Sequence, residues 1–505
     1  MPLIARHPKT LGDMDAAEFK KFGYQVIDWI ANYFQHPEKY PVLAQVEPGE
    51  IRRQLPQTPP ETPEDMKTIL ADFDRLILPG ITHWNHPAFF AYFSITGSAP
   101  GILAELLSAA LNVNAMLWKT APAATELEEV VLDWLRQMLG LPKEFQGVIM
   151  DTASVSSLCA IAAAREAIPE LKVREQGLAG RPEVPRLRLY TSEQAHSSIE
   201  KAAIVLGLGQ SGLRKIPTDA EFRMNPAALA QAIAEDLTQG WRPFCVVATV
   251  GTTSTTSIDP VPRIADICQQ YGLWLHVDAA YGGSAAILPE MRQVLDGCDR
   301  ADSLVVNPHK WLFAPIDVSA FYCRKPDILK QAFSLVPEYL RTAEDTLVRN
   351  YMDYGIQLGR RFRALKLWMI FRYYGRQGLM ARLREHIRLA QQFAGWVDAH
   401  PDFQRLAPVP FSTVCFHFLP KDLAPLSSEK VKQYVNSLNE ALLEAVNKTG
   451  EVYLSHTKLQ DTFVIRLAIG NIRTTEAHVT RAWELLQEHG SRLDRQRRPT
   501  KLKFI

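Results

Sequence analysis

The sequence lacks the cysteine patterns of disulfide frameworks and zinc sites. Its six cysteines are scattered along the chain, and no two of them form a Cys-x-x-Cys pair. Metal sites and redox motifs need close spacing of that kind, so we expect neither a bound metal nor a redox disulfide. Most of the cysteines lie among apolar residues, which predicts buried free thiols and a reducing compartment.

Long apolar runs and an excess of either charge are also missing. No uncharged apolar run approaches the roughly 20 residues that a membrane-spanning helix needs. The start of the chain, Met1–His7, has no apolar core of a secretory signal. The 56 basic and 55 acidic residues give a net charge of +1, which favours neither nucleic acid nor an anionic membrane as a partner. We therefore expect a soluble cytoplasmic protein.

The first hundred residues are predicted to form an appendage. Asp15 to Glu18 has the pattern of a capping box, which marks the start of a helix. A proline-rich connector, 56–63, follows this helix and cannot be regular helix itself. The helix carries an apolar stripe, which packs either on the chain's own body or on a partner subunit: Phe19, Phe22, Val26, Ile30 and Tyr33. We predict a helical dimerisation segment over 1–98.

From about residue 145, short apolar strands alternate with helices. The predicted strands are 147–150, 187–190, 245–250, 273–277, 304–306 and 320–323. Such alternation is typical of βαβ units, so it predicts an α/β domain over 99–375 with a mostly parallel sheet covered by helices on both faces. After Gly375 the pattern mixes helix with the strands 414–418 and 463–467, which predicts a small α+β domain over 376–505.

A lysine and an aspartate follow two of the predicted strands. Lys310 lies in a short predicted loop after strand 304–306, and Asp278 ends the apolar stretch 273–277. The carboxyl ends of parallel strands share one edge, where ligands of such sheets bind. A pyridoxal phosphate enzyme needs this pair, because the lysine amine forms a Schiff base with the cofactor aldehyde and the carboxylate holds a proton on the ring nitrogen. A surface lysine and a capping aspartate are the alternatives.

Further polar residues follow other strands. Ala153 and Ser154 open a helix after strand 147–150, where free backbone N–H groups can bind a phosphate; an ordinary helix cap is the alternative. Thr253 follows strand 245–250, and alone this is only a polar loop. His196 follows strand 187–190, where a flat imidazole can stack on a pyridine ring or can serve structure alone. The prediction of a cofactor site depends on all these groups lying at one edge.

These motifs resemble the group II pyridoxal-phosphate-dependent amino acid decarboxylases, and most closely those of the aromatic L-amino acid type. The similarity runs from about residue 15 to 490. It is carried by the motifs 83–84, 89–93, 125–128, 194–198, 276–281, 307–311 and 358–363. The resemblance implies the transferase-like fold type I, pyridoxal 5'-phosphate as cofactor, and an obligate homodimer whose active site is lined by both subunits.

The resemblance also implies roles for single residues. Lys310 holds the cofactor, Asp278 pairs with the ring nitrogen, and His196 stacks on one ring face with Ala280 on the other. Contacts to the phosphate or close to the cofactor are implied for Ala153, Ser154, Asn307, Thr253 and His309. Tyr339 matches the tyrosine of a mobile catalytic loop, which protonates the substrate carbon after carbon dioxide leaves.

The substrate pocket is implied to be aromatic. Residues similar to those of the family's pocket are Trp84, Tyr92, Phe93, Asn114, Met116 and Arg360, of which Asn114 and Met116 come from the partner. Ser94 and Ile95 replace a proline-threonine pair, which removes a hydroxyl near the substrate ring. The aromatic preference is kept, whereas a preference for a catechol ring is not implied.

We therefore predict decarboxylation of an aromatic L-amino acid to the arylalkylamine. One alternative is an oxidative aldehyde synthase of the same family, in which a phenylalanine usually replaces the tyrosine at Tyr339. Another is decarboxylation of glutamate or aspartate, which calls for a cationic clamp; only Lys119 lies close in sequence to the pocket motifs. A non-catalytic scaffold is the third, against which the intact Lys310, Asp278 and His196 argue.

Overall fold

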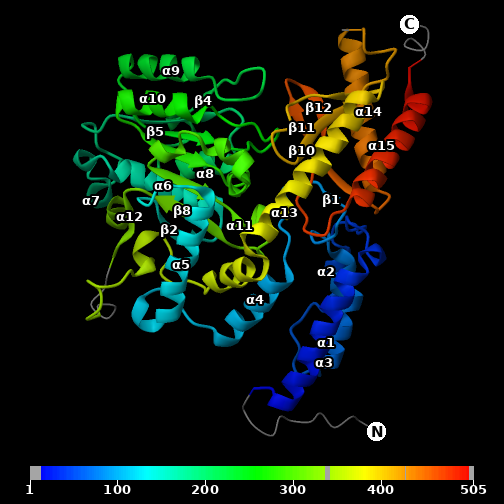
Figure 1. The fold of residues 1–505 in the computed structure, drawn as a ribbon, viewed down its shortest axis with the longest axis horizontal. Helices are drawn as coiled ribbons and strands as arrows, with labels where there is room; N and C mark the ends of the chain where they lie inside the picture. The colour runs from blue at the N-terminus through cyan, green and yellow to red at the C-terminus, as the bar shows by residue number, and fades with distance from the viewer. Residues whose placement is uncertain (1–12, 336–341, 427, 500–505) are drawn as a thin grey trace.

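A seven-stranded sheet forms the centre of the larger part of the molecule (Figure 1). The computed structural model describes residues 13–335, 342–426 and 428–499. The strand order is β2-β8-β7-β6-β5-β3-β4, and only β8 runs against its neighbours. The strands are β2 (Gln146–Met150), β3 (Leu187–Ser192), β4 (Leu213–Ile216), β5 (Arg242–Thr249), β6 (Trp274–Asp278), β7 (Ser303–Val306) and β8 (Ser319–Cys323).

Helices cover both faces of this sheet, as the apolar strands predicted. Successive residues of β5 face opposite cores: Val246 packs with one set of helices and Val247 with the other. The first set is α5 (Pro122–Leu139), α9 (Pro226–Thr238), α10 (Val261–Tyr271) and the start of α13 (Ala364–Ala399). The second set is α6 (Ala153–Glu166), α8 (Ser197–Val205) and α12 (Pro326–Phe333).

A second sheet of five strands, in the order β1-β11-β12-β10-β9, belongs to the smaller part. Its strands are β1 (Phe89–Phe90), β9 (Phe403–Arg405), β10 (Thr413–Phe418), β11 (Tyr453–Leu459) and β12 (Thr462–Ala468). The helices α14 (Glu429–Asn447) and α15 (Glu476–Arg497) pack with the second half of α13 around its core. Strand β1 comes from the N-terminal hundred residues and pairs with β11 in parallel.

The long helix α13 joins the two parts and crosses between them diagonally (Figure 1). It breaks at Gly375, whose φ of 59° and ψ of 173° lie outside helical geometry. Positive φ values suit glycine, since it has no side chain to clash. A helix was predicted only after this glycine, whereas the structure also has helix before it.

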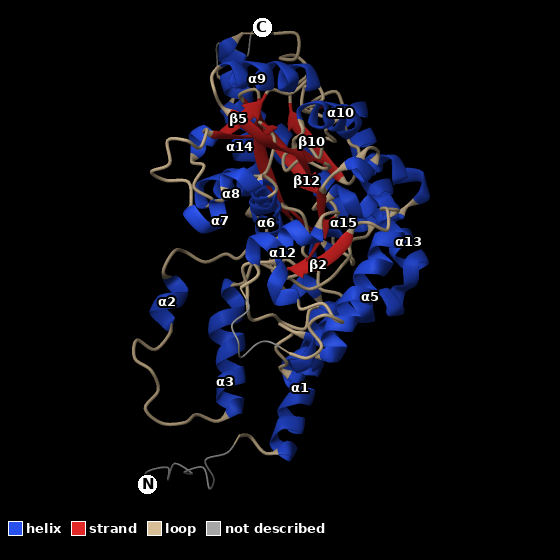
Figure 2. Ribbon diagram, turned by 90° about the vertical axis from the view of Figure 1, so that its left-hand side faces the viewer, coloured by secondary structure: helices blue, strands red, loops and turns tan. Residues whose placement is uncertain are grey.

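The N-terminal helices project away from both parts (Figure 2). Helix α1 (Ala16–Gln35) begins at Asp15, whose carboxylate accepts a hydrogen bond from the Glu18 amide at 2.8 Å, as the capping pattern predicted. The shorter helices α2 (Glu50–Gln54) and α3 (Met66–Asp72) follow, and α4 (Ala99–Leu111) leads into the large sheet. Among the described residues, no helix combines the length and the apolarity that crossing a membrane requires.

Other predictions about single elements have mixed outcomes. The six predicted strands of the large sheet are confirmed, and all six cysteines are free and buried. Strands β1, β4, β9 and β11 were not predicted. The predicted loop at Lys310 is wrong, because Pro308–Trp311 form one helical turn, α11, in which proline takes the first position. The boundaries of the three proposed domains stay a prediction.

Candidate active site

The residues predicted to carry chemistry gather at one edge of the large sheet. Strands β2, β3, β5, β6 and β7 all point the same way, since β2 and β7 both run opposite to β8. At or shortly beyond their carboxyl ends lie Ala153, His196, Thr253, Asp278 and Lys310, in that strand order. Side chains from five strands therefore meet where ligands of doubly covered sheets bind.

Lys310 lies in α11, directly after β7, and its backbone amide donates to the Asn307 carbonyl at 2.9 Å. Burial lowers the pKa of its amine, and the negative charge of Asp278 opposes that shift. A lowered pKa increases the fraction of neutral amine, which is the nucleophilic form. The environment therefore suits a lysine that attacks an aldehyde.

Asp278 ends β6 and has only 6% of its surface exposed. Its Oδ1 accepts a hydrogen bond from the Ala280 amide at 3.1 Å, which orients the carboxylate at the sheet edge. Beneath it, His276 is fixed between Ser157 Oγ at 3.2 Å and Ser303 Oγ at 2.9 Å. Burial lowers the pKa of His276 to about 4, so this ring is neutral and does not compete for the carboxylate charge.

His196 caps the start of α8 with its own side chain. Its Nδ1 accepts a hydrogen bond from the Ser198 amide at 3.2 Å and lies 2.9 Å from Ser198 Oγ. The neutral ring therefore carries its proton on Nε2. Burial lowers the pKa of His196, Lys310 lowers it further, and Asp278 raises it, so the three predicted groups act on one another.

Asn307 and His309 form a buried polar cluster beside the lysine. The Asn307 amide spans from Ser319 Oγ, at 2.6 Å, to His309 Nε2, at 3.2 Å. His309 Nδ1 accepts from the Val318 amide at 3.0 Å, and burial lowers the pKa of this ring to about 3. These contacts fix the turn that carries Lys310 against β8.

The start of α6 offers a site for a phosphate. Its N-cap, Thr152, makes no side-chain capping bond among the described residues, so the amides of Ala153 and Ser154 are left for an anion. Ser154 and Thr253 are both exposed at the same sheet edge. Together with the lysine and the buried carboxylate, this helix start fits pyridoxal phosphate: an amine for the aldehyde, an acid for the ring nitrogen and an anion site for the phosphate.

An aromatic stack stands beside Lys310. The Phe93 and Tyr281 rings are parallel with their centres 3.9 Å apart, and Tyr281 stacks on Trp311 at 4.8 Å. The Lys310 Nζ lies 5.1 Å from the centre of the Phe93 ring. A second aromatic group comes from the same segment, where Trp84 stacks with Tyr92 at 5.6 Å. Of the predicted aromatic wall, Phe93 therefore borders the amine.

Three residues predicted to bind substrate make their hydrogen bonds to other parts of the chain. The Arg360 guanidinium is buried and donates to Glu128 at 2.6 Å and to the Ile149 carbonyl at 2.8 Å, so it braces α5 against β2. Asn114 accepts a hydrogen bond from the Arg360 amide at 2.9 Å and contacts the Met116 sulfur at 3.4 Å. Tyr339 lies outside the described residues.

Arg466 is a site neighbour that the sequence reasoning missed. It is buried in β12 and donates to the carbonyls of Thr253, at 2.9 Å, and Ser254, at 2.8 Å. Its guanidinium also lies 5.7 Å from the Phe93 ring. The available signal was an arginine inside an otherwise apolar strand, which is costly unless the charge is paired or fully hydrogen-bonded.

A mostly parallel sheet with a lysine, a buried aspartate and a helix N-terminus at one edge defines a pyridoxal-phosphate-dependent enzyme of fold type I. The family comparison agrees: the model of the pyridoxal-dependent decarboxylase conserved domain matches residues 48–419. The chain belongs to this family, and it is a pyridoxal-phosphate-dependent carboxy-lyase.

The chain is similar to plant members of the family over nearly its whole length. Tyrosine/DOPA decarboxylase 2 of Papaver somniferum is 41% identical over 502 residues, covering 94% of this chain and 93% of the relative. A phenylacetaldehyde synthase of Arabidopsis thaliana is also 41% identical, covering 96% of this chain and 98% of the relative. The crystal structure of Oryza sativa TDC with PLP and tryptamine superposes with a TM-score of 0.91 at 36% identity, covering 96% of this chain and 100% of that one.

Proposed function

We propose that this enzyme decarboxylates aromatic L-amino acids to arylalkylamines. The observation that carries the proposal is the aromatic wall beside the lysine: Nζ of Lys310 lies 5.1 Å from the Phe93 ring, within a segment that also presents Trp84 and Tyr92. Flat aromatic surfaces favour a flat apolar substrate side chain. Relatives named as tyrosine and DOPA decarboxylases support the same substrate class.

The bound cofactor supplies an electron sink for the pair released when the carboxylate leaves as carbon dioxide. Lys310 would bind the cofactor through its amine, and the Asp278 carboxylate would keep a proton on the ring nitrogen. His196 would support the ring, and the α6 amides with Asn307 would hold the phosphate. The aromatic wall would hold the substrate ring and exclude water from the carboxylate, and Tyr339 or His196 would deliver a proton to the substrate α-carbon.

Product analysis of the purified holoenzyme tests this function. With phenylalanine, tyrosine, tryptophan and DOPA supplied separately, we expect at least one arylalkylamine with one equivalent of carbon dioxide, measured by mass spectrometry. Glutamate and aspartate serve as controls and should give no amine. Turnover of the acidic substrates alone would contradict the proposed substrate class.

A second candidate is an oxidative aldehyde synthase, because the Arabidopsis relative is named a phenylacetaldehyde synthase. This reaction would consume dioxygen and water and yield aldehyde, carbon dioxide, ammonia and hydrogen peroxide in place of the amine. Tyr339 favours plain decarboxylation, since a phenylalanine usually stands there in relatives that make aldehydes. The same product analysis decides between the two, because peroxide and ammonia form only on the oxidative route.

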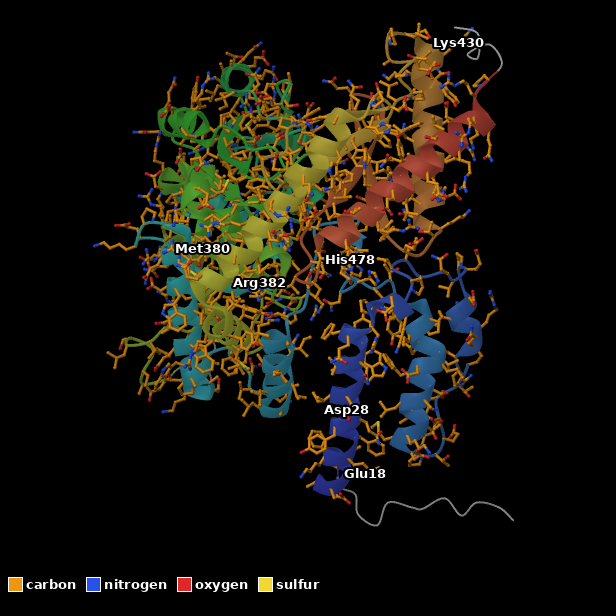
Figure 3. All side chains as sticks on the ribbon, turned by 45° about the vertical axis from the view of Figure 1, so that its right-hand side comes forward. Glu18, Asp28, Met380, Arg382, Lys430 and His478 are labelled. Atoms are coloured by element: carbon orange, nitrogen blue, oxygen red, sulfur yellow. The ribbon has the colours of Figure 1, made fainter. Side chains whose placement is uncertain are left out.

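We also propose a cytoplasmic homodimer with the three domains 1–98, 99–375 and 376–505. Helix α1, which carries Glu18 and Asp28, projects from the body alongside α3 (Figure 3). Its apolar side chains form, with those of α3 and the following turn, a cavity of about 410 Å³ lined by Gln25, Val26, Trp29, Ile30, Leu70, Phe73 and Asp74. A second chain would cover these groups and bring Asn114 and Met116 to the partner's site. Buried free thiols support a reducing compartment.

Leu107→Glu in α4 is expected to weaken the dimer, because this side chain is 50% exposed and α4 lies on the side of the large part toward the N-terminal helices (Figure 1). A buried carboxylate without a partner is costly at an interface. Light scattering at decreasing concentration should show half the wild-type mass for the variant. Leu237→Glu in α9 is the matched control and should leave the mass unchanged, since Leu237 is 48% exposed and α9 lies at the end of the large part away from the N-terminal helices (Figure 1). Equal masses for all three proteins at every concentration would contradict this interface.

A further inference from the structure

A buried chain of hydrogen bonds runs from the residue next to the catalytic lysine into the small domain. Trp311 Nε1 donates to His386 Nδ1 at 3.0 Å, and His386 Nε2 lies 3.0 Å from the Asn471 carbonyl oxygen. Trp311 belongs to the same helical turn as Lys310, whereas Asn471 lies between β12 and α15. His386 sits on α13, one turn beyond Arg382, where that helix passes from one part to the other (Figure 3).

The direction of every bond in this chain is fixed by chemistry. An indole N–H can only donate, so His386 Nδ1 must accept, and the neutral ring carries its proton on Nε2. That proton is donated to the Asn471 carbonyl. His386 is 3% exposed, and burial lowers the pKa of its imidazole to about 4, so the ring stays neutral and the chain intact at neutral pH.

The same small-domain turn, Ile469–Thr474, holds the substrate wall. Asn471 Nδ2 donates to the backbone carbonyls of Trp84, at 3.3 Å, and His86, at 3.0 Å. The Thr474 hydroxyl donates to the Pro87 carbonyl at 2.6 Å. The backbone that carries the proposed aromatic wall is therefore hydrogen-bonded to the turn that His386 reaches from the other side.

A parallel link joins the aromatic stack to this turn. Tyr281, which lies between Phe93 and Trp311, has its hydroxyl 2.6 Å from Ser412 Oγ. Ser412 in turn donates to the Ile469 carbonyl at 2.5 Å, so the tyrosine must donate to the serine. Two neighbouring rings of the stack are thus tied to positions 469 and 471 of one turn.

We propose that His386 and Asn471 are positioning residues for the substrate pocket. They set the distance between the turn of Lys310 and the wall that begins at Trp84, across the junction between large and small domains. Catalytic geometry needs supports of this kind, since small misplacements of reacting groups reduce rates strongly. The inference rests on the proposed function only in taking this wall as the surface for the aromatic substrate.

Two variants of the holoenzyme test the proposal by steady-state kinetics with the best aromatic substrate. Trp311→Phe keeps an aromatic ring in the stack but removes the N–H donor and part of the buried ring volume, and His386→Phe removes both bonds of the chain. For each variant we expect KM to rise by roughly 10-fold, because the substrate binds about tenfold more weakly. We expect kcat to stay within about 3-fold of wild type. A merely structural role would lower the unfolding temperature and leave KM unchanged.

His417→Phe is the matched control. His417 is also a buried histidine of the small domain, with its Nε2 3.1 Å from Gln404 Oε1, and burial lowers its pKa to about 4 as well. Within the described part of the chain, His417 makes no side-chain hydrogen bond to the wall or to the lysine turn, so we expect a similar loss of thermal stability with wild-type KM. A KM change in this control as large as in His386→Phe would overturn the proposal.

Amide hydrogen exchange provides a readout that needs no turnover. In His386→Phe, the amides of residues 84–93 should exchange at least about 10-fold faster than in wild type, whereas His417→Phe should leave them unchanged. If wild-type protein does not turn over any aromatic amino acid, the proposed function fails, and the exchange experiment still decides on the hydrogen-bonded chain. Unchanged exchange at 84–93 together with unchanged KM would overturn the inference.

Discussion

Lys310→Ala is expected to abolish turnover, with kcat falling by on the order of 10³-fold or more, as losses of an enzyme's nucleophile do. The amine lies in a buried turn at the sheet edge, and its lowered pKa makes the neutral form available to bind the cofactor aldehyde. Alanine removes this anchor without adding bulk. Steady-state release of carbon dioxide from the proposed substrates measures the loss.

Borohydride treatment gives this prediction a second measurement. Reduction of the bond between lysine and cofactor should add the cofactor mass permanently to wild-type protein, on the peptide that contains Lys310. The variant should gain no such mass. Both results are independent of which amino acid is the substrate, so they test the assignment of the lysine by itself.

Two controls separate the amine from its charge. Lys310→Arg keeps a cation near Asp278 but offers no neutral amine at working pH, so it should be as inactive as the alanine variant. Lys201→Ala removes a different positive charge that acts on His196, and it should retain most of the activity. Full activity in Lys310→Ala would rule out the mechanism proposed above.

Much of this site was predictable because each functional group directly follows an apolar strand. His196, Asp278 and Lys310 lie far apart in sequence, yet parallel strands place all three at one edge. The sequence pattern carries both pieces of information: the strand, from its apolar run, and the end of the strand, from the first polar residue. The edge then follows from the parallel arrangement.

Other features depend on long-range pairing that no local pattern encodes. Strand β8 lies between β2 and β7 and runs in the opposite direction. An apolar run does not indicate whether a strand pairs parallel or antiparallel with its neighbours. Strand β1 has only two residues and exists because β11, more than 350 residues away, offers its edge. A run of that length has no period to detect.

The ion pair of Arg360 illustrates a further limit. The arginine was grouped with substrate-binding residues because of the motif around it, while its guanidinium is held by Glu128 on α5, with N and O 2.6 Å apart. A similar motif identifies the residue but does not show which group pairs with it in the folded chain. That partner determines the role of a buried charge. The same holds for His386, whose role becomes visible only with Trp311 and Asn471 in place.

Asp278→Ala is expected to lower kcat by about 10²–10³-fold, the usual cost of removing one preorganised group that stabilises developing charge. The carboxylate is buried at the end of β6 and oriented by the Ala280 amide. Without it, the ring nitrogen of the cofactor has no acid partner and loses its proton. The cofactor should still bind through Lys310, so borohydride should still fix it to the protein.

Asp259→Asn is a suitable control for the loss of a buried carboxylate. Asp259 is fully buried near the end of β5, where its oxygens accept from the amides of Met224, at 2.7 Å, and Thr249, at 2.8 Å. Burial raises the pKa of this acid to about 7, so its charge is only partly present at neutral pH. We expect its variant to lose stability while kcat stays within about 3-fold of wild type, because its bonds go to backbone rather than to the cofactor.

A cofactor methylated on the ring nitrogen distinguishes the proton-holding role of Asp278 from every structural one. Its positive charge is permanent, so it does not need a carboxylate to keep a proton in place. Asp278→Ala leaves room for the methyl group. In this variant the analogue should give a kcat at least about 10-fold higher than the ordinary cofactor does, because the methylated ring nitrogen stays positively charged without the carboxylate. In wild type the analogue should give no gain, because the carboxylate already maintains the charge and the methyl group competes for its space. If kcat of Asp278→Ala is no higher with the methylated cofactor than with the ordinary one, the carboxylate stabilises the fold and does not keep the proton on the ring nitrogen.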